Sequence, residues 1–303
     1  MNSFNQKISI DFKNNIELFI KREDQLHSII SGNKLRKLKY NLEEAKRQNK
    51  SCLLTFGGAF SNHILAVAGA GNEFGFATIG IIRGEELEHK ISENPTLLRA
   101  QDLGMKFHFV TRSQYRNKEE VTFLDSLKNK FGDFYLVPEG GTNSFAIKGC
   151  EEILTASDKS FFTHITCAVG TGGTISGIIN SSIEKQQIIG FSSLKGAFLS
   201  DVIRNFVNKT NWNIIEDYHF GGYGKINDEL VSFLNLFYNH TSIPLDPVYT
   251  GKMVFGVMDL INKGYFLPNS KILMIHTGGL QGIKGMNFAL KNKNRELIQY
   301  DEN

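Results

Sequence analysis

The sequence is poor in cysteine and proline and has almost no excess charge of either sign. Only 3 of its 303 residues are cysteine and 5 are proline, while 34 lysines and arginines stand against 31 aspartates and glutamates. Cys52, Cys150 and Cys167 form no CxxC pair and no cluster with histidine, so neither a disulfide framework nor a metal site is indicated. The net charge of +3, with basic residues scattered among acidic ones, argues against a nucleic-acid partner.

Long hydrophobic runs are absent as well. The longest apolar stretches, such as residues 74–82, fall well short of the ~18 consecutive apolar residues that a membrane span needs. Lys7, Asp11 and Lys13 interrupt any early signal-peptide core. We therefore expect a cytoplasmic protein with no membrane partner. At roughly 150 residues per domain, the length predicts about two domains.

Glycine, in contrast, is abundant, with 29 residues, and much of it occurs in short clusters beside apolar runs. Glycine at the end of a strand indicates that the backbone turns tightly or comes close to another group. The clusters lie at residues 57–58, 140–141, 170–173, 221–222 and 278–279.

Short runs rich in β-branched and aromatic residues alternate with longer amphipathic segments. This alternation predicts an α/β fold of parallel sheets with helices on both faces. In such sheets ligands bind at the carboxyl ends of the strands, where most of the glycine clusters fall. The expected strands are 52–56, 77–82, 106–110, 134–137, 164–169, 188–192 and 272–276. The expected helices begin near residue 35 and at 144, 174, 227, 251 and 282, with a polar surface helix within 112–130.

Residues 167–174 carry the first chemical signal. An expected strand runs into Gly170-Thr171-Gly172-Gly173 and then into a helix that begins near Thr174. Successive backbone N–H groups at a helix start form an anion cradle, for which phosphate is the natural guest. The segment is neither a P-loop nor a dinucleotide fingerprint. Taken alone, it is equally compatible with a tight turn that binds nothing.

Two further segments carry polar groups at expected helix starts. Lys34 stands in the first turn of its helix, where a cation opposes the helix dipole and is not favoured for stability. Ser61, Asn62 and His63 follow the Gly57-Gly58 turn and offer a hydroxyl, an amide and an imidazole at one strand end. The simpler interpretations are a solvated lysine and a helix cap.

Taken together and in this order, these segments resemble those of a family of pyridoxal-phosphate (PLP) enzymes. The family includes 1-aminocyclopropane-1-carboxylate (ACC) deaminase and D-cysteine desulfhydrase. The similarity runs from about Lys21 to Gly282. It is carried by seven ordered motifs: GNKxRK (32–37), GGxxSNH (57–63), PEGGTN (138–143), GTGGT (170–174), GYG (222–224), PVYTGK (247–252) and IHTGG (275–279).

The resemblance implies the tryptophan-synthase-β-like PLP fold. In that fold two three-layer α/β/α domains of mainly parallel sheet are combined, and the smaller is inserted in the larger. Here the larger, PLP-binding domain would comprise residues 1–44 and 146–303, and the smaller domain residues 45–145. Members of the family are usually homodimers.

The resemblance also implies the roles of individual residues toward the cofactor. Lys34 would form the internal Schiff base with PLP, Asn62 would bond its 3-hydroxyl and Thr250 would face its pyridine nitrogen, with Thr277 beside it. The phosphate would lie on Gly170, Thr171, Gly172, Gly173 and Thr174.

A second set of residues would act on an amino-acid substrate. Ser61 and His63, with Asn62, would hold the substrate carboxylate or line its pocket. Tyr223 and Tyr249 would flank the reacting carbon. Lys34, Ser61, Tyr223 and Tyr249 are therefore the expected catalytic residues.

Two positions bear on the choice of reaction. ACC deaminases of this family have glutamate and leucine where this sequence has Thr250 and Thr277, which is the desulfhydrase-like pattern. A carboxylate keeps the pyridine nitrogen protonated and makes the ring a strong electron sink, whereas a threonine can hydrogen-bond a neutral nitrogen. The sequence therefore predicts a lyase that removes the α-proton with Lys34 and converts D-cysteine to pyruvate, sulfide and ammonia.

Two alternatives remain open at this point, and the sequence argues against a third. The protein could be an ACC deaminase that gives 2-oxobutyrate and ammonia, or a non-catalytic protein that binds an amino acid or PLP. An NAD-dependent enzyme or serine hydrolase lacks its motif here. Phe60, where smaller or polar residues are common in the family, is expected to narrow the pocket and favour a substrate other than D-cysteine.

Overall fold

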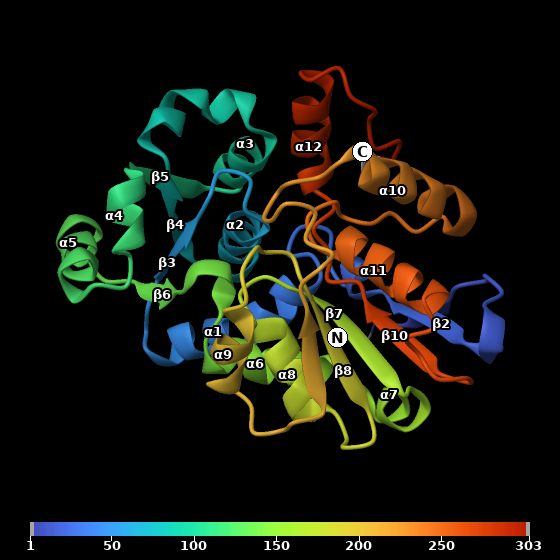
Figure 1. The fold of residues 1–303 in the computed structure, drawn as a ribbon. Helices are drawn as coiled ribbons and strands as arrows, with labels where there is room; N and C mark the ends of the chain where they lie inside the picture. Colours follow the sequence, from blue (N-terminus) through green and yellow to red (C-terminus); the bar gives the residue numbers. More distant parts are fainter. Residues whose placement is uncertain (1–2, 301–303) are drawn as a thin grey trace.

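The structure, a computed structural model that describes residues 3–300, is built on two mainly parallel β-sheets covered by helices (Figure 1). The strands are β1 (Asn5–Lys7), β2 (Glu17–Lys21), β3 (Cys52–Gly57), β4 (Ala77–Arg83), β5 (Met105–Val110), β6 (Tyr135–Val137), β7 (His164–Val169), β8 (Gln187–Ser192), β9 (Trp212–Ile215) and β10 (Lys271–Ile275). The helices are α1 (Asn33–Arg47), α2 (Asn62–Phe74), α3 (Pro95–Asp102), α4 (Arg112–Arg116), α5 (Val121–Phe131), α6 (Ser144–Cys150), α7 (Ala156–Phe161), α8 (Gly173–Ser181), α9 (Leu199–Arg204), α10 (Asp228–Thr241), α11 (Thr250–Asn262) and α12 (Gly282–Lys291).

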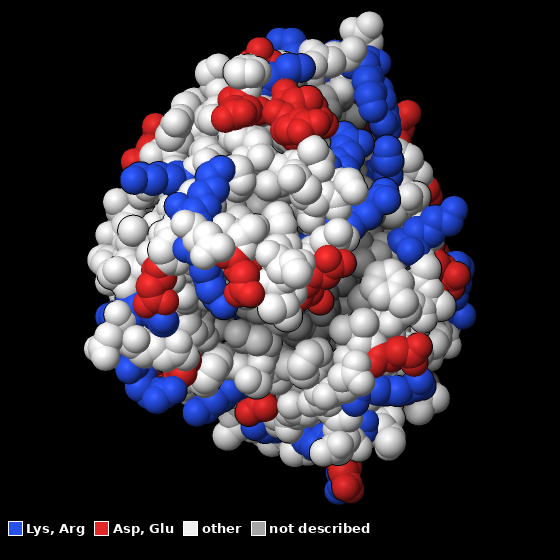
Figure 2. Space-filling model, turned by 90° about the vertical axis from the view of Figure 1, so that its left-hand side faces the viewer, with Lys and Arg blue, Asp and Glu red and all other residues white. Residues whose placement is uncertain are grey.

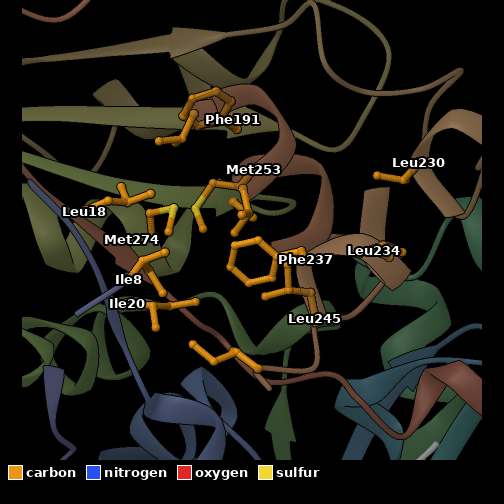
Figure 3. Packing of buried hydrophobic residues seen from close by; sticks show 14 of the residues in the cluster. Ile8, Leu18, Ile20, Phe191, Leu230, Leu234, Phe237, Leu245, Met253 and Met274 are labelled. Atoms are coloured by element: carbon orange, nitrogen blue, oxygen red, sulfur yellow. The ribbon is translucent and has the colours of Figure 1, made fainter. Parts of the chain in front are cut away.

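The larger sheet has six strands in the order β1-β2-β10-β7-β8-β9. Only the pairing of β1 with β2 is antiparallel, and the other four pairings are parallel. On one face, α10, α11 and α12 pack their apolar side chains onto the sheet, as Figure 3 shows for Phe237 of α10 and Met253 of α11 beside Met274 of β10. On the other face lie α6, α8 and α9. The result is a three-layer α/β/α arrangement.

The smaller sheet has four strands in the order β5-β4-β3-β6, all parallel. The helices α1, α2 and α3 cover one face, and α4 and α5 cover the other. This sheet forms the left side of the molecule in Figure 1, and the two sheets direct the carboxyl ends of several strands toward a common region.

The predicted α/β class is confirmed, and each of the seven expected strands is present within one residue at each end. Three short strands were missed, β1, β2 and β9. Polar residues make up, bound or interrupt these segments, which leaves too little apolar pattern to distinguish them from a loop. The helix expected from residue 144 to about 156 ends at Cys150 and continues as a 3₁₀ turn, because Thr155 caps a new helix. The expected helix at 112–130 is two helices, because α4 ends at Arg116 and Glu120 precedes the start of α5.

Helix α1 connects the two sheets. Its apolar side chains Leu35, Leu38 and Leu42 pack into the cluster that covers the smaller sheet. The division into residues 1–44 with 146–303 and residues 45–145 stays a prediction, and this packing places its first boundary inside a helix that belongs to the smaller sheet's core. Among residues 3–300, no helix combines the length and the hydropathy that crossing a membrane would require.

Candidate active site

A cavity of about 360 Å³ lies where the carboxyl ends of strands from both sheets meet. Most of the residues that line this inner cavity follow β3, β6, β7, β8 and β10 or lie in the first turns of α1, α2 and α8. Arg83 ends β4, Tyr223 lies between β9 and α10, and Tyr249 directly precedes α11. Of the predicted site residues, eleven line it: Lys34, Ser61, Asn62, His63, Gly170, Thr171, Gly172, Thr174, Tyr223, Tyr249 and Thr277. Gly173 and Thr250 lie directly beside lining residues but do not line it themselves.

Lys34 lies in the first turn of α1. Gly32, which precedes this helix, has φ +61°, and any side chain there would overlap the carbonyl of Thr277, so the helix start is locked against the segment after β10. The Lys34 Nζ lies 3.0 Å from Oδ1 of Asn33, whose Nδ2 donates to Oγ1 of Thr174 at 2.7 Å. Burial, and then the charge of Lys37, lower the pKa of Lys34 to about 7. A large fraction of its amine is therefore neutral and nucleophilic at neutral pH.

The glycine-rich turn after β7 lies on the Thr174 side of the hydrogen bond between Asn33 and Thr174. Gly172 has φ +81° and precedes the first turn of α8, whose backbone N–H groups have no acceptor within the helix. These amides and the hydroxyls of Thr171 and Thr174 surround one end of the cavity. The segment therefore has the geometry of an anion cradle.

Lys37 belongs to the same end of the cavity and was missed by the sequence reasoning. Its Nζ lies 2.9 Å from the carbonyl oxygen of Gly140, 3.1 Å from Oγ1 of Thr142 and 3.5 Å from Oγ1 of Thr171. Burial lowers the pKa of Lys37. The available signal was its spacing, because residues three apart share one helix face and Lys37 follows Lys34 by three.

The polar start of α2 forms a second side of the cavity. The Ser61 hydroxyl accepts from the amides of His63 and Ile64, so Ser61 does cap the helix. The Nε2 of His63 pairs with Oγ1 of Thr55 at 2.8 Å, while its buried Nδ1 has no partner among residues 3–300. Burial, and then the charges of Lys34 and Lys37, hold the pKa of His63 well below its usual range, so its imidazole is neutral.

Two tyrosines close the cavity from the larger sheet. The rings of Tyr223 and Tyr249 meet edge to face, with 6.1 Å between their centroids. Lys252, another residue that the sequence reasoning did not use, donates from Nζ to the carbonyls of His219 and Gly222 at 2.8 and 2.9 Å. It thereby tethers the segment that carries Tyr223 to α11. Burial raises the pKa of both tyrosines, that of Tyr249 well above its usual value, so both hydroxyls keep their protons.

Thr250 and Asp246 define the start of α11. The Asp246 carboxylate accepts from the amides of Val248, Tyr249 and Thr250 at 2.9, 2.8 and 2.7 Å and so fixes the helix start. The Oγ1 of Thr250 is completely buried and has no hydrogen-bond partner in the described chain. A buried unpaired hydroxyl is costly, which indicates that a bound group satisfies it.

One expectation from the sequence is not met, and two lining residues were not anticipated. Phe60 does not line the inner cavity; its ring is 55% exposed and lies against Gly285 at the start of α12, on an adjoining outer cavity. Arg83, which lies in none of the motifs, and Glu139, which lies in the PEGGTN motif but was assigned no role, also line the inner cavity. Within residues 3–300 no group of three or more metal-ligating side chains gathers.

Comparisons with known proteins agree with this geometry. The family profile described as "Pyridoxal-phosphate dependent enzyme" matches residues 7–278. The Arabidopsis thaliana protein named "Bifunctional D-cysteine desulfhydrase/1-aminocyclopropane-1-carboxylate deaminase, mitochondrial" is 31% identical over 298 residues, covering 89% of this chain and 74% of the relative. A D-cysteine desulfhydrase of Klebsiella pneumoniae is 28% identical and covers 87% of each chain.

A solved structure described as an ACC deaminase homologue superimposes with a TM-score of 0.74 at 26% identity, covering 93% of this chain and 90% of that one. The match extends over both sheets, and the family profile covers every motif segment that lines the cavity except the last glycine of the IHTGG motif. The chain therefore belongs to the ACC deaminase and D-cysteine desulfhydrase family of pyridoxal-phosphate-dependent enzymes, and its cofactor is pyridoxal phosphate.

Proposed function

We propose that this protein catalyses α,β-elimination of D-cysteine, consuming water and giving pyruvate, sulfide and ammonia. The observation that carries this choice is Thr250, whose buried hydroxyl has no partner in the described chain at the position where ACC deaminases of the family have glutamate. A hydroxyl can hydrogen-bond a neutral pyridine nitrogen but cannot keep it protonated as a carboxylate would. A thiol leaves readily without the stronger electron sink, whereas an unactivated cyclopropane has no ordinary leaving group.

The residues around the inner cavity fit pyridoxal phosphate. The amides at the start of α8, the hydroxyls of Thr171 and Thr174 and the ammonium of Lys37 would hold the phosphate. Lys34 would hold the aldehyde carbon, Asn62 the 3-hydroxyl and Thr250 the ring nitrogen. When bound there, the cofactor supplies an electron sink for the charge that develops at the substrate α-carbon.

Lys34 moves the α-proton in this proposal. Because its pKa is lowered to about 7, its freed amine is a neutral base near physiological pH and a competent acid once protonated. The contact of its Nζ with Asn33 orients the amine toward the start of α8. The neighbouring charge of Lys37 contributes to the lowered pKa of Lys34 in the protein without cofactor.

Tyr223 and Tyr249 act as proton donors at the leaving group. Their raised pKa values keep the hydroxyls protonated, so they can donate to a departing thiolate but cannot serve as bases at neutral pH. Ser61 and the neutral His63, with Asn62, bind the substrate carboxylate through amide, hydroxyl and ring donors at the start of α2. Tyr223 lines the cavity and is half exposed, so its ring lies between the site and solvent.

The second candidate is deamination of ACC, because the Arabidopsis relative is named for both activities. One assay separates them. Purified PLP-loaded protein is given D-cysteine, L-cysteine, D-serine and ACC while pyruvate, sulfide and 2-oxobutyrate are measured. We expect pyruvate and sulfide from D-cysteine; turnover of ACC alone would contradict the proposal. A protein that takes up no PLP would support the non-catalytic alternative.

Substitution of Thr250 tests directly whether its buried hydroxyl determines the reaction. Thr250→Val keeps the shape and removes the hydroxyl, and Thr250→Glu supplies a carboxylate. Loss of one hydrogen bond to the ring nitrogen should lower kcat/KM for D-cysteine about tenfold in the valine variant. In the glutamate variant, the ratio of kcat/KM for D-cysteine to kcat/KM for ACC should fall further. Equal PLP content in all three proteins is the control, and unchanged D-cysteine turnover in both variants would contradict the role.

We also propose that the protein works as a cytoplasmic homodimer with an inserted smaller domain, as the family resemblance implies. Sedimentation of the PLP-loaded protein tests the assembly: a monomer at micromolar concentration would contradict it. Localisation of a tagged copy tests the compartment.

A further inference from the structure

A second, outer cavity of about 710 Å³ adjoins the inner one. The two cavities share three lining residues, Gly58, Arg83 and Glu139. The outer cavity lies between the turn after β3, the end of β4 and helix α4, and it includes Phe60 and Tyr115. A substrate bound in the inner cavity could therefore extend a side chain past Arg83 into this space.

Arg83 stands at the junction. It is the last residue of β4, next to the end of β3, and its Nη2 lies 3.7 Å from where a side chain on Gly58 would begin. Its guanidinium carbon lies 5.7 Å from the centre of the Tyr115 ring. Arg83 forms no ion pair and no side-chain hydrogen bond with any residue between 3 and 300. An arginine fork without a carboxylate partner at the junction of two cavities is available to an anion.

The acidic groups of the outer cavity are already compensated. Glu139 accepts from the Tyr115 hydroxyl at 2.6 Å and pairs with Lys118 at 3.3 Å. Glu86 pairs with Arg112 at 2.9 Å. These pairs leave two cations of the outer cavity without a carboxylate partner in the described chain, Arg83 and Arg116, and of these Arg83 also lines the inner cavity. This excess of positive charge is local. Over the whole face that carries α4 and α5, Figure 2 shows Lys and Arg interspersed with Asp and Glu.

We propose that Arg83 determines specificity for amino acids whose β-substituent carries a negative charge, in particular cysteine thioethers with a terminal carboxylate. The inference rests on the proposed elimination and extends its substrate class beyond D-cysteine. The amino-acid part occupies the inner cavity, the sulfur lies near Tyr223 and Tyr249, and the carboxylate pairs with Arg83. The outer cavity accommodates the longer substituent, with Phe60 and Tyr115 as its apolar walls.

The reaction balances in the same way as with D-cysteine. S-carboxymethyl-D-cysteine loses its α-proton to Lys34, the bond between Cβ and sulfur breaks with both electrons going to sulfur, and a tyrosine hydroxyl protonates the thiolate. Hydrolysis then gives pyruvate, ammonia and thioglycolate from one substrate and one water. No oxidant or reductant takes part.

The test compares two probes of equal shape and different charge. S-carboxymethyl-D-cysteine and S-carbamoylmethyl-D-cysteine differ by a carboxylate against an amide, and both release a thiol that a disulfide dye detects. Because a charge-assisted bidentate pair is lost with the amide, kcat/KM for the carboxylate should be at least about tenfold higher in the PLP-loaded protein. Equal values for the two probes would overturn the proposal.

Variants assign the preference to Arg83. Arg83→Gln should reduce the preference to within about threefold of unity, and Arg83→Lys should keep part of it, because lysine retains the charge without the fork. Arg112→Gln is the matched control: it removes the same charge from the same cavity, but from a residue that pairs with Glu86. An equal loss of preference in both glutamine variants would reduce the effect to general electrostatics and overturn the role of Arg83.

A binding measurement separates this inference from the proposed function. The visible absorbance of the bound cofactor changes when an amino acid enters the site and gives an apparent Kd for each probe without turnover. If neither D-cysteine nor either probe yields pyruvate, the proposed elimination fails, and the ratio of the two Kd values still decides whether Arg83 selects the carboxylate. If D-cysteine is turned over and the two probes have equal kcat/KM values and equal Kd values, only the further inference fails.

Discussion

The two ends of the inner cavity satisfy their polar groups in opposite ways. At the cofactor end, formed by Lys34, Lys37 and residues 170–174, side chains bond to one another and to backbone carbonyls. At the substrate end, which would also hold the pyridine ring of the cofactor, the buried Nδ1 of His63 and Oγ1 of Thr250 have no partner within the described chain, and Arg83 has no counter-ion there. We infer that the cofactor end is preorganised, while groups at the substrate end depend on what binds.

This difference explains why family membership is easier to establish than the substrate. The preorganised end needs glycine, threonine and lysine at fixed spacings, and these are the residues that form recognisable motifs. The substrate end depends on single side chains from separate segments, such as Thr250 and Arg83. The named relatives at about 30% identity accordingly include both ACC deaminase and D-cysteine desulfhydrase activities.

The largest effect should come from Lys34, which serves both ends. Lys34→Ala removes the general base, and D-cysteine elimination should fall by about 10³-fold or more. Pyruvate formation at saturating PLP measures it. Lys39→Ala is the control, because Lys39 lies on the same helix but pairs with Glu152 away from the cavity, and its variant should keep activity within about twofold. Activity retained in Lys34→Ala would contradict the role of Lys34 as the general base.

The next effect should be confined to the cofactor end. Lys37→Met keeps an extended buried side chain and removes the ammonium, so the Kd for PLP should rise roughly 10- to 100-fold. Titration of the apoprotein by cofactor absorbance measures it. Because the change also leaves the Gly140 carbonyl with one donor fewer, thermal unfolding of the apoprotein is followed in parallel. An unchanged Kd in a folded variant would show that the cofactor end does not need this charge.

The sequence was sufficient for much of the fold and for the cofactor end, for identifiable physical reasons. Short runs rich in β-branched and aromatic residues predicted seven strands, and three-to-four spacing in the longer segments predicted the main helices, because burial imposes those patterns. The strand β2 pairs with β1 and β10 in the larger sheet, but it has only three apolar residues between Glu17 and Lys21, too few to show a period. Lys252 and Asp246 position Tyr223 and α11 through contacts with backbone groups, which leave no pattern in the sequence.

A smaller effect should be confined to the substrate end. Lys252→Met removes the two bonds that hold the carbonyls of His219 and Gly222, so Tyr223 loses its fixed position. Because slight misplacement of a catalytic group is costly, kcat for D-cysteine should fall about tenfold while the Kd for PLP stays within about twofold. Parallel measurement of kcat and PLP affinity tests the separation. A matching loss of PLP affinity would mean that the two ends are not independent.

The smallest effect concerns the protonation of Lys34, the residue that belongs to both ends. With a pKa of about 7, Lys34 in the apoprotein is mainly protonated at pH 6 and mainly neutral at pH 8. Since only the neutral amine attacks the aldehyde of PLP, the rate of cofactor uptake should rise about tenfold between these pH values and level off above them. In Lys37→Met a cause of the lowered pKa is removed, so the midpoint should move to higher pH. Burial is the larger cause, and the midpoint should therefore stay well below that of a free lysine; a midpoint unchanged by the variant would mean that the two lysines do not interact.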